Sequence, residues 1–422
     1  MSDDSPTRMV TYTARLYPTA AQRAILVRWF GAARWIWNHA LERRSKACRR
    51  RGERVSGSDV SRAITALKQT TRYGWLGEVP STVLVQKLRD RDWAFRNFFE
   101  GRARYPRFRR RANGQAVRLQ LDQRQVRRRQ RWEAGAIAVP GLGELRFRAG
   151  RHPQAFPKMT TIRQAADGSY HASFTVEREI TPRAAPVRDA VGVGVGLKDR
   201  AVLSSGDAVT NPRHVRRAEP RRRRAQRALS RKQNGSNRWH AQRRRLARAN
   251  ARVCNRRNDH LHKLTRLIVD ENQVIAVEDL GVRALARTSL ASSVHDAAWG
   301  ELLRQLRYKA DWAGRTFVAV DRYAPTTQVC SGCGAQTGPS GRDGLNVRQW
   351  RCDACGAHHD RDENAAINIR ELGMAQLLPA GSGEVRRVEA GGCSRGDAAA
   401  VPAGEARARQ ADSARTDRAD EV

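Results

Sequence analysis

Four cysteines near the C-terminal end of the chain have the spacing of metal ligands. They form two CxxC pairs separated by eighteen residues, at Cys330, Cys333, Cys352 and Cys355. Four thiolates arranged in this way are a usual shell for a tetrahedral zinc ion, and a complete shell makes the site structural. A redox dithiol would need only one pair. The sequence therefore predicts a zinc ribbon, with His358 and His359 outside the metal site.

Two acidic residues stand where a carboxylate could reach another metal. Glu278 ends the apolar run 274–277, which predicts a buried strand whose last side chain emerges at a sheet edge. Asp362 comes just before a predicted helix over 364–372. Nucleases of the RNase H/RuvC type hold two Mg²⁺ ions with such carboxylates, and the ions stabilise the attacking and leaving oxygens. Strand-end acids and helix caps are common on their own, so the prediction depends on their combination with the ribbon.

The charge of the chain predicts a polyanionic partner. Lys and Arg number 80 against 42 Asp and Glu, which gives a net charge of +38 and a pI near 11.4. Neutralising phosphates with such a surplus releases condensed counterions and drives binding. The segment 376–422 carries seven Arg and eight Asp or Glu, so the surplus lies in the first 375 residues. Ribosomal-type RNA binding would give the same charge without needing the carboxylates.

The densest positive charge falls on two predicted helices within 214–270, with a turn at 234–237. Apolar residues at 246, 253, 261, 264 and 268 give the second helix a packing seam and leave its other faces basic. The alternative is a solvated charged hairpin, but little acid compensates the charge. We predict that the hairpin contacts a nucleic-acid backbone through Arg221, Arg222, Arg223, Arg224, Arg243, Arg244, Arg245, Arg256 and Arg257.

The N-terminal part reads as a strand, then helices, then more strands. Residues 10–16 alternate like a strand, and Thr19 and Gln22 have the spacing of a capping box at a helix start. Two apolar stripes follow, which we assign to a core in preference to a base-stacking surface: Leu26, Trp29, Phe30, Ala33, Ile36, Trp37 and Leu41, then Val83, Leu84, Leu88, Trp93, Ala94 and Phe98. Strands are expected over 107–187, including a hairpin turned at Asp167-Gly168. Helices inserted between barrel-like strands would make a distinct lobe.

The second half alternates strands and helices, which predicts an α/β sheet. Strands are expected over 191–205, 274–280 and 317–320, and an amphipathic helix over 299–312. Residues 376–422 have little apolar periodicity and predict a disordered tail. The chain has no run of eighteen apolar residues and begins with a polar segment, so we expect neither secretion nor a membrane span. Its cysteine usage suits a reducing cytoplasm, where we expect it to associate with the nucleoid.

Several motifs occur together in the order typical of one family. They are RLYPT (15–19), YPRF (105–108), GLKDRAVLS (196–204), LSRK (229–232), IAVEDL (275–280), WG (299–300), CSGC (330–333) and HDRDENAA (359–366). In these the chain resembles the TnpB family, transposon-encoded RNA-guided nucleases related to type V CRISPR effectors, over roughly residues 10–372. The resemblance implies a wedge domain and helical recognition lobe over 1–187, a RuvC-like domain over 188–324 and 359–375, and a zinc ribbon over 325–358.

The resemblance also implies the partners and the site. Members bind a transposon-derived guide RNA and search duplex DNA beside a short adjacent motif, and base pairing reads the sequence. Glu278 and Asp362 match the second and third catalytic acids of the family. The first acid belongs at Gly194, which has no side chain. Asp189 and Asp199 each lie five residues away, an odd number that points them to the other face of a strand.

The sequence therefore predicts an RNA-guided DNA-binding protein whose cleavage is absent or severely impaired. Glu278 and Asp362 would be residual Mg²⁺ ligands, and the alternating glycines at 192, 194 and 196 do not open a helix as a dinucleotide-binding motif would. One alternative is an active RNA-guided endonuclease of an insertion sequence. Another is a basic RNA-binding protein that uses no guide.

Overall fold

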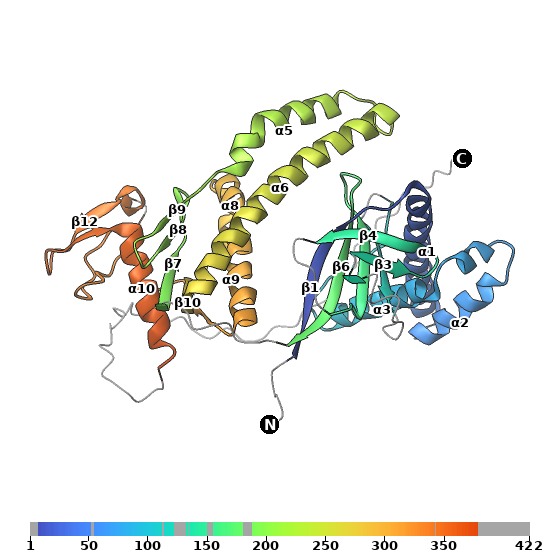
Figure 1. The fold of residues 1–422 in the computed structure, drawn as a ribbon, viewed down its shortest axis with the longest axis horizontal. Helices are drawn as coiled ribbons and strands as arrows, with labels where there is room; N and C mark the ends of the chain where they lie inside the picture. The colour runs from blue at the N-terminus through green and yellow to red at the C-terminus, as the bar shows by residue number, and fades with distance from the viewer. Residues whose placement is uncertain are drawn as a thin grey trace, which may run out of the picture. The chain divides into compact units, whose positions relative to one another are not determined.

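The computed structural model describes residues 7–51, 55–111, 114–121, 132–133, 135–149, 155–179, 188–341 and 343–378 (Figure 1). The chain divides into the units 1–377 and 378–422, and only the first is discussed below. All but 376–378 of the predicted disordered tail lies outside the described residues. Within the described ranges, every helix is too short or too polar to cross a membrane.

A six-stranded antiparallel sheet forms the framework of the N-terminal half. Its order is β2-β5-β6-β1-β4-β3, and β1 pairs with β6 along its whole length. The strands are β1 (Thr7–Leu16), β2 (Gln115–Gln120), β3 (Ala136–Val139), β4 (Gly143–Ala149), β5 (Met159–Gln164) and β6 (Tyr170–Glu179). The predicted turn at Asp167-Gly168 joins β5 to β6. The sheet is a curled half-barrel, so the expectation of barrel-like strands holds at this coarser level.

Helices are inserted between β1 and β2, as the sequence predicts. They are α1 (Ala20–Arg51), α2 (Gly57–Lys68), the 3₁₀ helix η1 (Gly74–Glu78) and α3 (Ser81–Phe99). The capping box at the start of α1 is confirmed, because Thr19 N donates to Gln22 Oε1 at 3.0 Å and Gln22 N to Thr19 Oγ1 at 3.3 Å. All seven apolar residues of the α1 stripe are buried and most join the core beneath the sheet.

The stripe predicted on α3 is wrong at Trp93. Its side chain is 64% exposed, whereas Phe95 is buried. The buried face follows positions 84, 88, 91 and 95, whose spacing of four, three and four residues keeps them on one side of a helix. Position 93 falls on the opposite side.

A five-stranded mixed sheet carries the second half and confirms the α/β prediction. Its order is β11-β10-β7-β8-β9, with β7, β10 and β11 parallel and β7, β8 and β9 antiparallel. The strands are β7 (Arg188–Gly194), β8 (Asp199–Leu203), β9 (Ala208–Thr210), β10 (Asn272–Glu278) and β11 (Thr316–Val320).

Helices cover both faces of this sheet (Figure 1). On one face, α6 (Asn237–Glu271) and α9 (Trp299–Ala313) pack on Val191, Val193, Ile275 and Val277. On the other, α10 (Arg361–Ala375) packs on Ala276. Successive strand residues point to opposite faces, so the even-numbered residues at the ends of β7 and β10 face α10. The remaining helices are α5 (His214–Ser230), α7 (Val282–Leu285) and α8 (Ala291–Ala297).

Gly192 brings α10 into direct backbone contact with β7. A Cβ atom at this position would lie 1.9 Å from the carbonyl oxygen of Ala366 and 2.7 Å from the backbone nitrogen of Arg370. No side chain fits between two backbones at such a distance. A glycine is therefore required for the helix to lie this close to the strand.

Gly194, by contrast, has room for a side chain. The nearest atoms to a Cβ built there are the backbone oxygen of Asp362 at 3.5 Å and that of Val202 at 3.6 Å, which are ordinary contacts. Gly196 is again confined, since its Cβ would lie 2.8 Å from the Asp199 oxygen. Of the three alternating glycines, only Gly194 stands where packing does not demand a glycine.

We predict that Gly192→Ala lowers the free energy of unfolding by about 1–3 kcal/mol or more, because α10 must move off β7. Gly194→Ala is the matched control and should change it by less than about 0.5 kcal/mol. Urea unfolding midpoints of the two variants test this difference. Equal midpoints would contradict the packing role assigned to Gly192.

Candidate functional site

Three segments far apart in the sequence meet at one edge of the mixed sheet. In the parallel register of β7 and β10, Gly192 pairs with Ala276 and Val193 with Val277. Continued by one residue, the same register places Glu278 beside Gly194. The backbone oxygen of Asp362 lies 3.5 Å from a Cβ built at Gly194, so the first turn of α10 reaches the same place.

The partners of the two carboxylates are residues that sequence reasoning missed. Asp362 accepts a hydrogen bond from Nη1 of Arg348 at 2.9 Å, and the two side chains are 30% and 46% exposed. Glu278 Oε1 accepts one from the Thr326 hydroxyl at 2.7 Å. Neither Arg348 nor Thr326 lies in a recognisable sequence pattern.

Asp362 does not serve as the cap of its helix. The N-cap of α10 is Asp360, whose carboxylate accepts hydrogen bonds from the backbone nitrogens of Asp362 at 2.9 Å and Glu363 at 3.1 Å. The carboxylate of Asp362 is therefore left for the sheet edge and for Arg348.

The neighbouring acids do not fill the gap at Gly194. Val202 pairs with Gly194 across β7 and β8, whereas the backbone oxygen of Asp199 lies 2.8 Å from a Cβ built at Gly196, so Asp199 stands beside Gly196 and not beside Gly194. Asp189 is exposed near the start of β7. Within the described ranges, the only cluster of three or more potential ligand side chains is the cysteine cluster.

The residues at this edge do not fit a two-Mg²⁺ site as they stand. Two carboxylates are available, one of them is paired with an arginine, and the third position has no side chain. A pair of Mg²⁺ ions needs converging oxygen ligands, which this arrangement does not supply.

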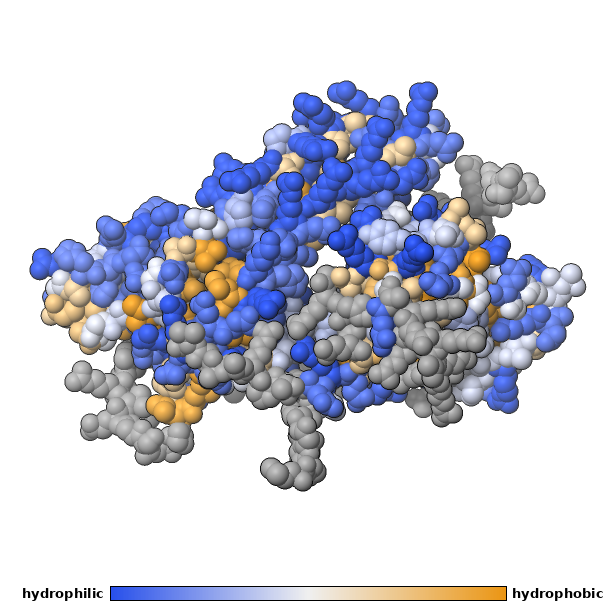
Figure 2. All heavy atoms as spheres, viewed as in Figure 1, coloured by the Kyte–Doolittle hydropathy of each residue, from blue (hydrophilic) through white to orange (hydrophobic). Residues whose placement is uncertain are grey.

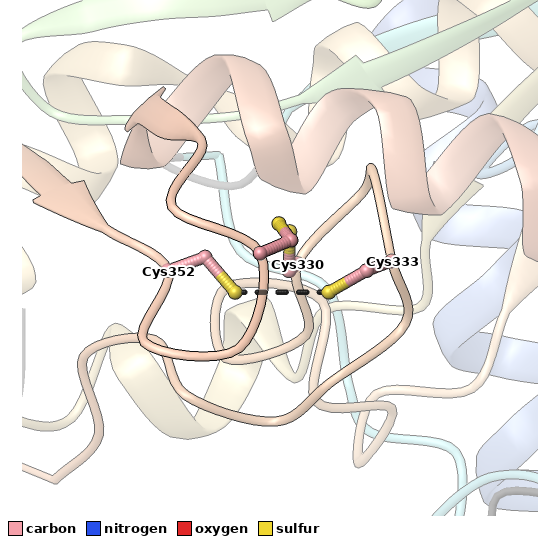
Figure 3. A group of neighbouring side chains, drawn as sticks. Cys330, Cys333 and Cys352 are labelled. Carbon is pink, nitrogen blue, oxygen red and sulfur yellow. Dashed lines mark hydrogen bonds between the residues drawn. The ribbon is translucent and has the colours of Figure 1, made fainter.

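The four cysteines converge as a zinc site requires (Figure 3). All four sulfur atoms lie within 4.8 Å of one another, with 3.7 Å between Cys330 and Cys355 and between Cys333 and Cys352. Zn–S bonds of about 2.3 Å in a tetrahedron give S–S separations of roughly 3.8 Å. The donor set and its spacing therefore fit a structural zinc ion.

The two knuckles have the same construction. The carbonyl of Cys330 accepts from Gly334 N and that of Cys352 from Gly356 N, both at 2.8 Å. Each glycine has a positive φ, 78° and 73°, which favours glycine over other residues. The Thr337 hydroxyl donates to the Cys352 sulfur and, with the backbone N–H groups of Ala354 and Cys355, lowers the pKa of that thiol, which favours the thiolate that binds metal.

His359 lies beside the cysteine cluster but is not one of its four ligands. Its Nε2 is 3.0 Å from the sulfur of Cys330, and its ring packs on Trp350 at 4.8 Å. The four-thiol shell is complete without it, in agreement with the prediction that both histidines stand outside the metal site. His358 is exposed. The two belong to a small hairpin of β12 (Gln349–Arg351) and β13 (His358–Asp360), preceded by the 3₁₀ helix η2 (Asp343–Asn346).

Two buried asparagines join the cysteine segment to α10. Asn364 Oδ1 accepts from Ser331 N at 2.9 Å, and its amide donates to Val329 O at 2.8 Å. Asn368 donates to the carbonyls of Thr326 and Val329 at 2.8 and 2.7 Å. Two asparagines four residues apart on a mostly apolar helix were the signal for this contact in the sequence. The cysteine segment thereby fixes the helix that carries Asp362.

The predicted basic hairpin is confirmed as two helices, α5 and α6, with Gly235 (φ 82°) in the turn and Ser236 capping α6. Residues 214–271 hold 19 Arg and Lys against four Asp and Glu. The hairpin surface is strongly hydrophilic (Figure 2). Asp296, itself buried, accepts from Val215 N and Arg216 N and fixes the start of α5.

The nine predicted arginines divide into two groups. Arg222 donates to Asn250 at 2.9 Å and Arg257 to the His295 carbonyl at 2.8 Å, so these two join neighbouring elements. The others are exposed to solvent, and Arg223 among them pairs within α5 with Glu219 at 2.7 Å: Arg221, Arg223, Arg224, Arg243, Arg244, Arg245 and Arg256.

Family comparisons cover most of the described chain. The family OrfB_IS605, described as "Probable transposase", matches residues 173–289. The family described as "Cas12f1-like, TNB domain" matches residues 299–369. A helix-turn-helix description matches residues 9–53, and the described part of this range holds β1 and the single long helix α1.

A solved structure shares the fold. It is titled as a cryo-EM structure of a Cas12f1–sgRNA–target DNA complex, and it aligns with 86% of this chain and 98% of its own at a TM-score of 0.51 and 11% identity. The half-barrel with inserted helices and the mixed sheet with its cysteine cluster therefore define a Cas12f-like α/β protein.

Two relatives identify the family. A Streptomyces pristinaespiralis protein named "Putative RNA-guided DNA endonuclease" is 40% identical over 86% of this chain and 88% of its own length. The Escherichia coli K12 protein of the same description, InsQ, is 31% identical over 88% and 94%. The chain belongs to the OrfB, or TnpB, family.

We predict that the purified chain holds one zinc ion, bound by the four cysteines. Cys330→Ser should lose it, because three thiolates leave the shell open. Cys254→Ser removes an exposed cysteine of α6 and serves as the control. Zinc measured by mass spectrometry decides the point, and a full equivalent retained by Cys330→Ser would refute the site.

Proposed function

We propose that this chain is an RNA-guided DNA-binding protein whose DNA cleavage is absent or severely impaired. The observation that carries the proposal is Gly194, which places no side chain where β7 meets Glu278 and Asp362. The glycine is not needed for packing, since a side chain fits there. In this proposal one metal ligand is missing at position 194, and the strands that surround it are formed normally.

Guided binding is supported by the relatives and by charge. The relatives are named for RNA-guided DNA cleavage, and the Cas12f1 neighbour was solved with its sgRNA and target DNA. By analogy, this chain would bind a transposon-derived guide RNA and a DNA target beside a short adjacent motif. Base pairing would read the sequence while the protein holds the duplex by its phosphates.

The exposed arginines of the hairpin are the proposed backbone contacts. They lie on faces of α5 and α6 that make no core, and only a few acids offset them. Arg221, Arg224 and the run 243–245 would contact phosphates, while Arg222 and Arg257 hold the helices in place.

Arg348 has a second role in this proposal. Its guanidinium lies 2.9 Å from the Asp362 carboxylate and supplies positive charge at the edge where family members would place Mg²⁺. Glu278 and Asp362 are then residual ligands whose number is too small for two ions. Guided binding needs neither residue.

The names of the relatives favour a second candidate, an active RNA-guided endonuclease associated with an insertion sequence. In that case water or a neighbouring acid would replace the missing carboxylate. The two candidates share the guide, the target and the fold, and they differ only in whether the DNA is cut.

We predict that the native chain, loaded with its guide RNA, retains target DNA but does not cut it in Mg²⁺. Gly194→Asp should cut at least about 100-fold faster, because loss of a direct ligand exceeds the roughly 10–100-fold cost of a second-shell loss. Gly194→Asn is the matched control, with the same size and no carboxylate, and should stay inactive. Plasmid cleavage and filter retention measure the two activities.

Other outcomes separate the alternatives. Cutting by the native chain at the rate of Gly194→Asp would establish the active endonuclease. Heterogeneous bound RNA and no guide-dependent DNA retention would indicate a basic RNA-binding protein that uses no guide.

A further inference from the structure

We propose that a pocket on the inserted helices binds a single unpaired nucleobase of a bound strand. The pocket lies between α1 and η1, reaches the turn at Gly141 between β3 and β4, and has a volume of about 760 Å³. Pockets of about 300–1,000 Å³ accept ligands of nucleotide size. Its chemistry comes from six residues: Arg28, Arg34, Trp35, His39, Tyr73 and Trp75.

Aromatic rings make a corner in this pocket. Trp75 stands at 78° to Trp35 with 5.9 Å between ring centroids, and Tyr73 lies 5.1 Å from Trp35 at 43°. His39 backs Trp35, almost parallel to it at 4.7 Å. A planar base laid flat on one wall of the corner makes an edge contact with the other, which is how aromatic rings prefer to pair.

The rings are open to a ligand. Trp75 is 39% exposed, and Trp35 and Tyr73 are half-buried, although the neighbouring Trp29 and Ile36 of α1 are buried in the core. Trp35 is therefore more exposed than the core residues of the same helix, and its ring can be reached from the pocket. Base stacking on such rings tolerates every base, since each base has a π face.

Positive charge surrounds the corner. Arg34 lines the pocket, and the Arg72 guanidinium lies 5.5 Å from the Tyr73 ring centre. The two acids of the lining have partners of their own: Glu78 lies 3.6 Å from Arg28, and Glu42 pairs with Lys46 at 2.5 Å. Arginines beside a stacking surface suit the phosphates on either side of a base, a combination that an apolar peptide would not need.

One buried atom faces no protein partner. Nε2 of His39 is buried and makes no hydrogen bond within the described residues. Burial lowers the pKa of His39, and the charge of Arg43 lowers it further, so the ring is neutral near pH 7. A neutral ring adds no charge behind Trp35, so His39 serves as a flat aromatic support for that wall of the pocket.

This inference rests on the proposed function only in requiring a bound strand. The pocket lies on the half-barrel side of the chain, away from the hairpin arginines and from the edge at Gly194 in sequence and in sheet. The pocket would bind an unpaired base, a part of the strand that contacts to the phosphate backbone do not hold. The base could come from RNA or from DNA, and the chemistry is the same.

The test uses the full chain and short oligothymidylates with a central 2-aminopurine, in RNA and DNA forms. Stacking in the pocket should quench the fluorescence of the native complex. Trp75→Ala should weaken binding about 5- to 150-fold, the range for one stacked base, and abolish the quenching. Trp93→Ala removes an equally large exposed ring on α3 and should change neither.

The possible outcomes separate the pocket proposal from the proposed function. Quenching with only one of the two oligonucleotides identifies RNA or DNA as the source of the base. If the native chain and Trp75→Ala bind and quench alike, the pocket proposal fails while guided binding stands. If the native chain binds neither oligonucleotide, nor guide and target, then the proposed function fails with it. Trp35→Phe, which keeps a ring, should retain the quenching and controls for misfolding of α1.

Discussion

The direct contact between the backbones of α10 and β7 is the constraint on which the site depends. Gly192 permits it, because any Cβ there would strike Ala366. With the helix seated on the strand, the first turn of α10 comes level with the ends of β7 and β10. Asp362, Gly194 and Glu278 are then brought together by packing, whatever side chain stands at position 194. The shape of the edge therefore does not depend on a side chain at position 194.

The cysteine segment secures the same helix from the other side. Asn364 and Asn368 bind its carbonyls, and Arg348 within it reaches the Asp362 carboxylate. A buried amide that lost these partners would carry a desolvation cost, so the segment and the helix stabilise each other. Zinc binding would therefore position the acidic edge as well as the ribbon. The hairpin arginines and the aromatic pocket lie on other elements, so polyanion binding does not depend on the chemistry of that edge.

Local patterns in the sequence were sufficient for most elements. The capping box at Thr19, the paired CxxC knuckles and the alternation of β7 and β10 each have a short-range physical cause, and the structure has them as predicted. Trp93 was misplaced because each residue advances a helix by about 100°, so an error of two residues decides which side is buried. The contact of Arg348 with Asp362 was missed because it depends on how the hairpin β12–β13 folds back on α10, a tertiary arrangement with no local signal. The room at Gly194 could likewise be seen only once α10 was in place.

The central claim is that the edge at Gly194 lacks a ligand and therefore does not hold a pair of divalent ions. The most direct measurement is Mn²⁺ binding, by titration calorimetry and electron paramagnetic resonance, to the zinc-loaded native chain and to Gly194→Asp, with Glu278→Ala as background. The account predicts that the native chain matches the background and that Gly194→Asp gains a spin-coupled pair of ions. A coupled pair in the native chain that disappears in Glu278→Ala would contradict it.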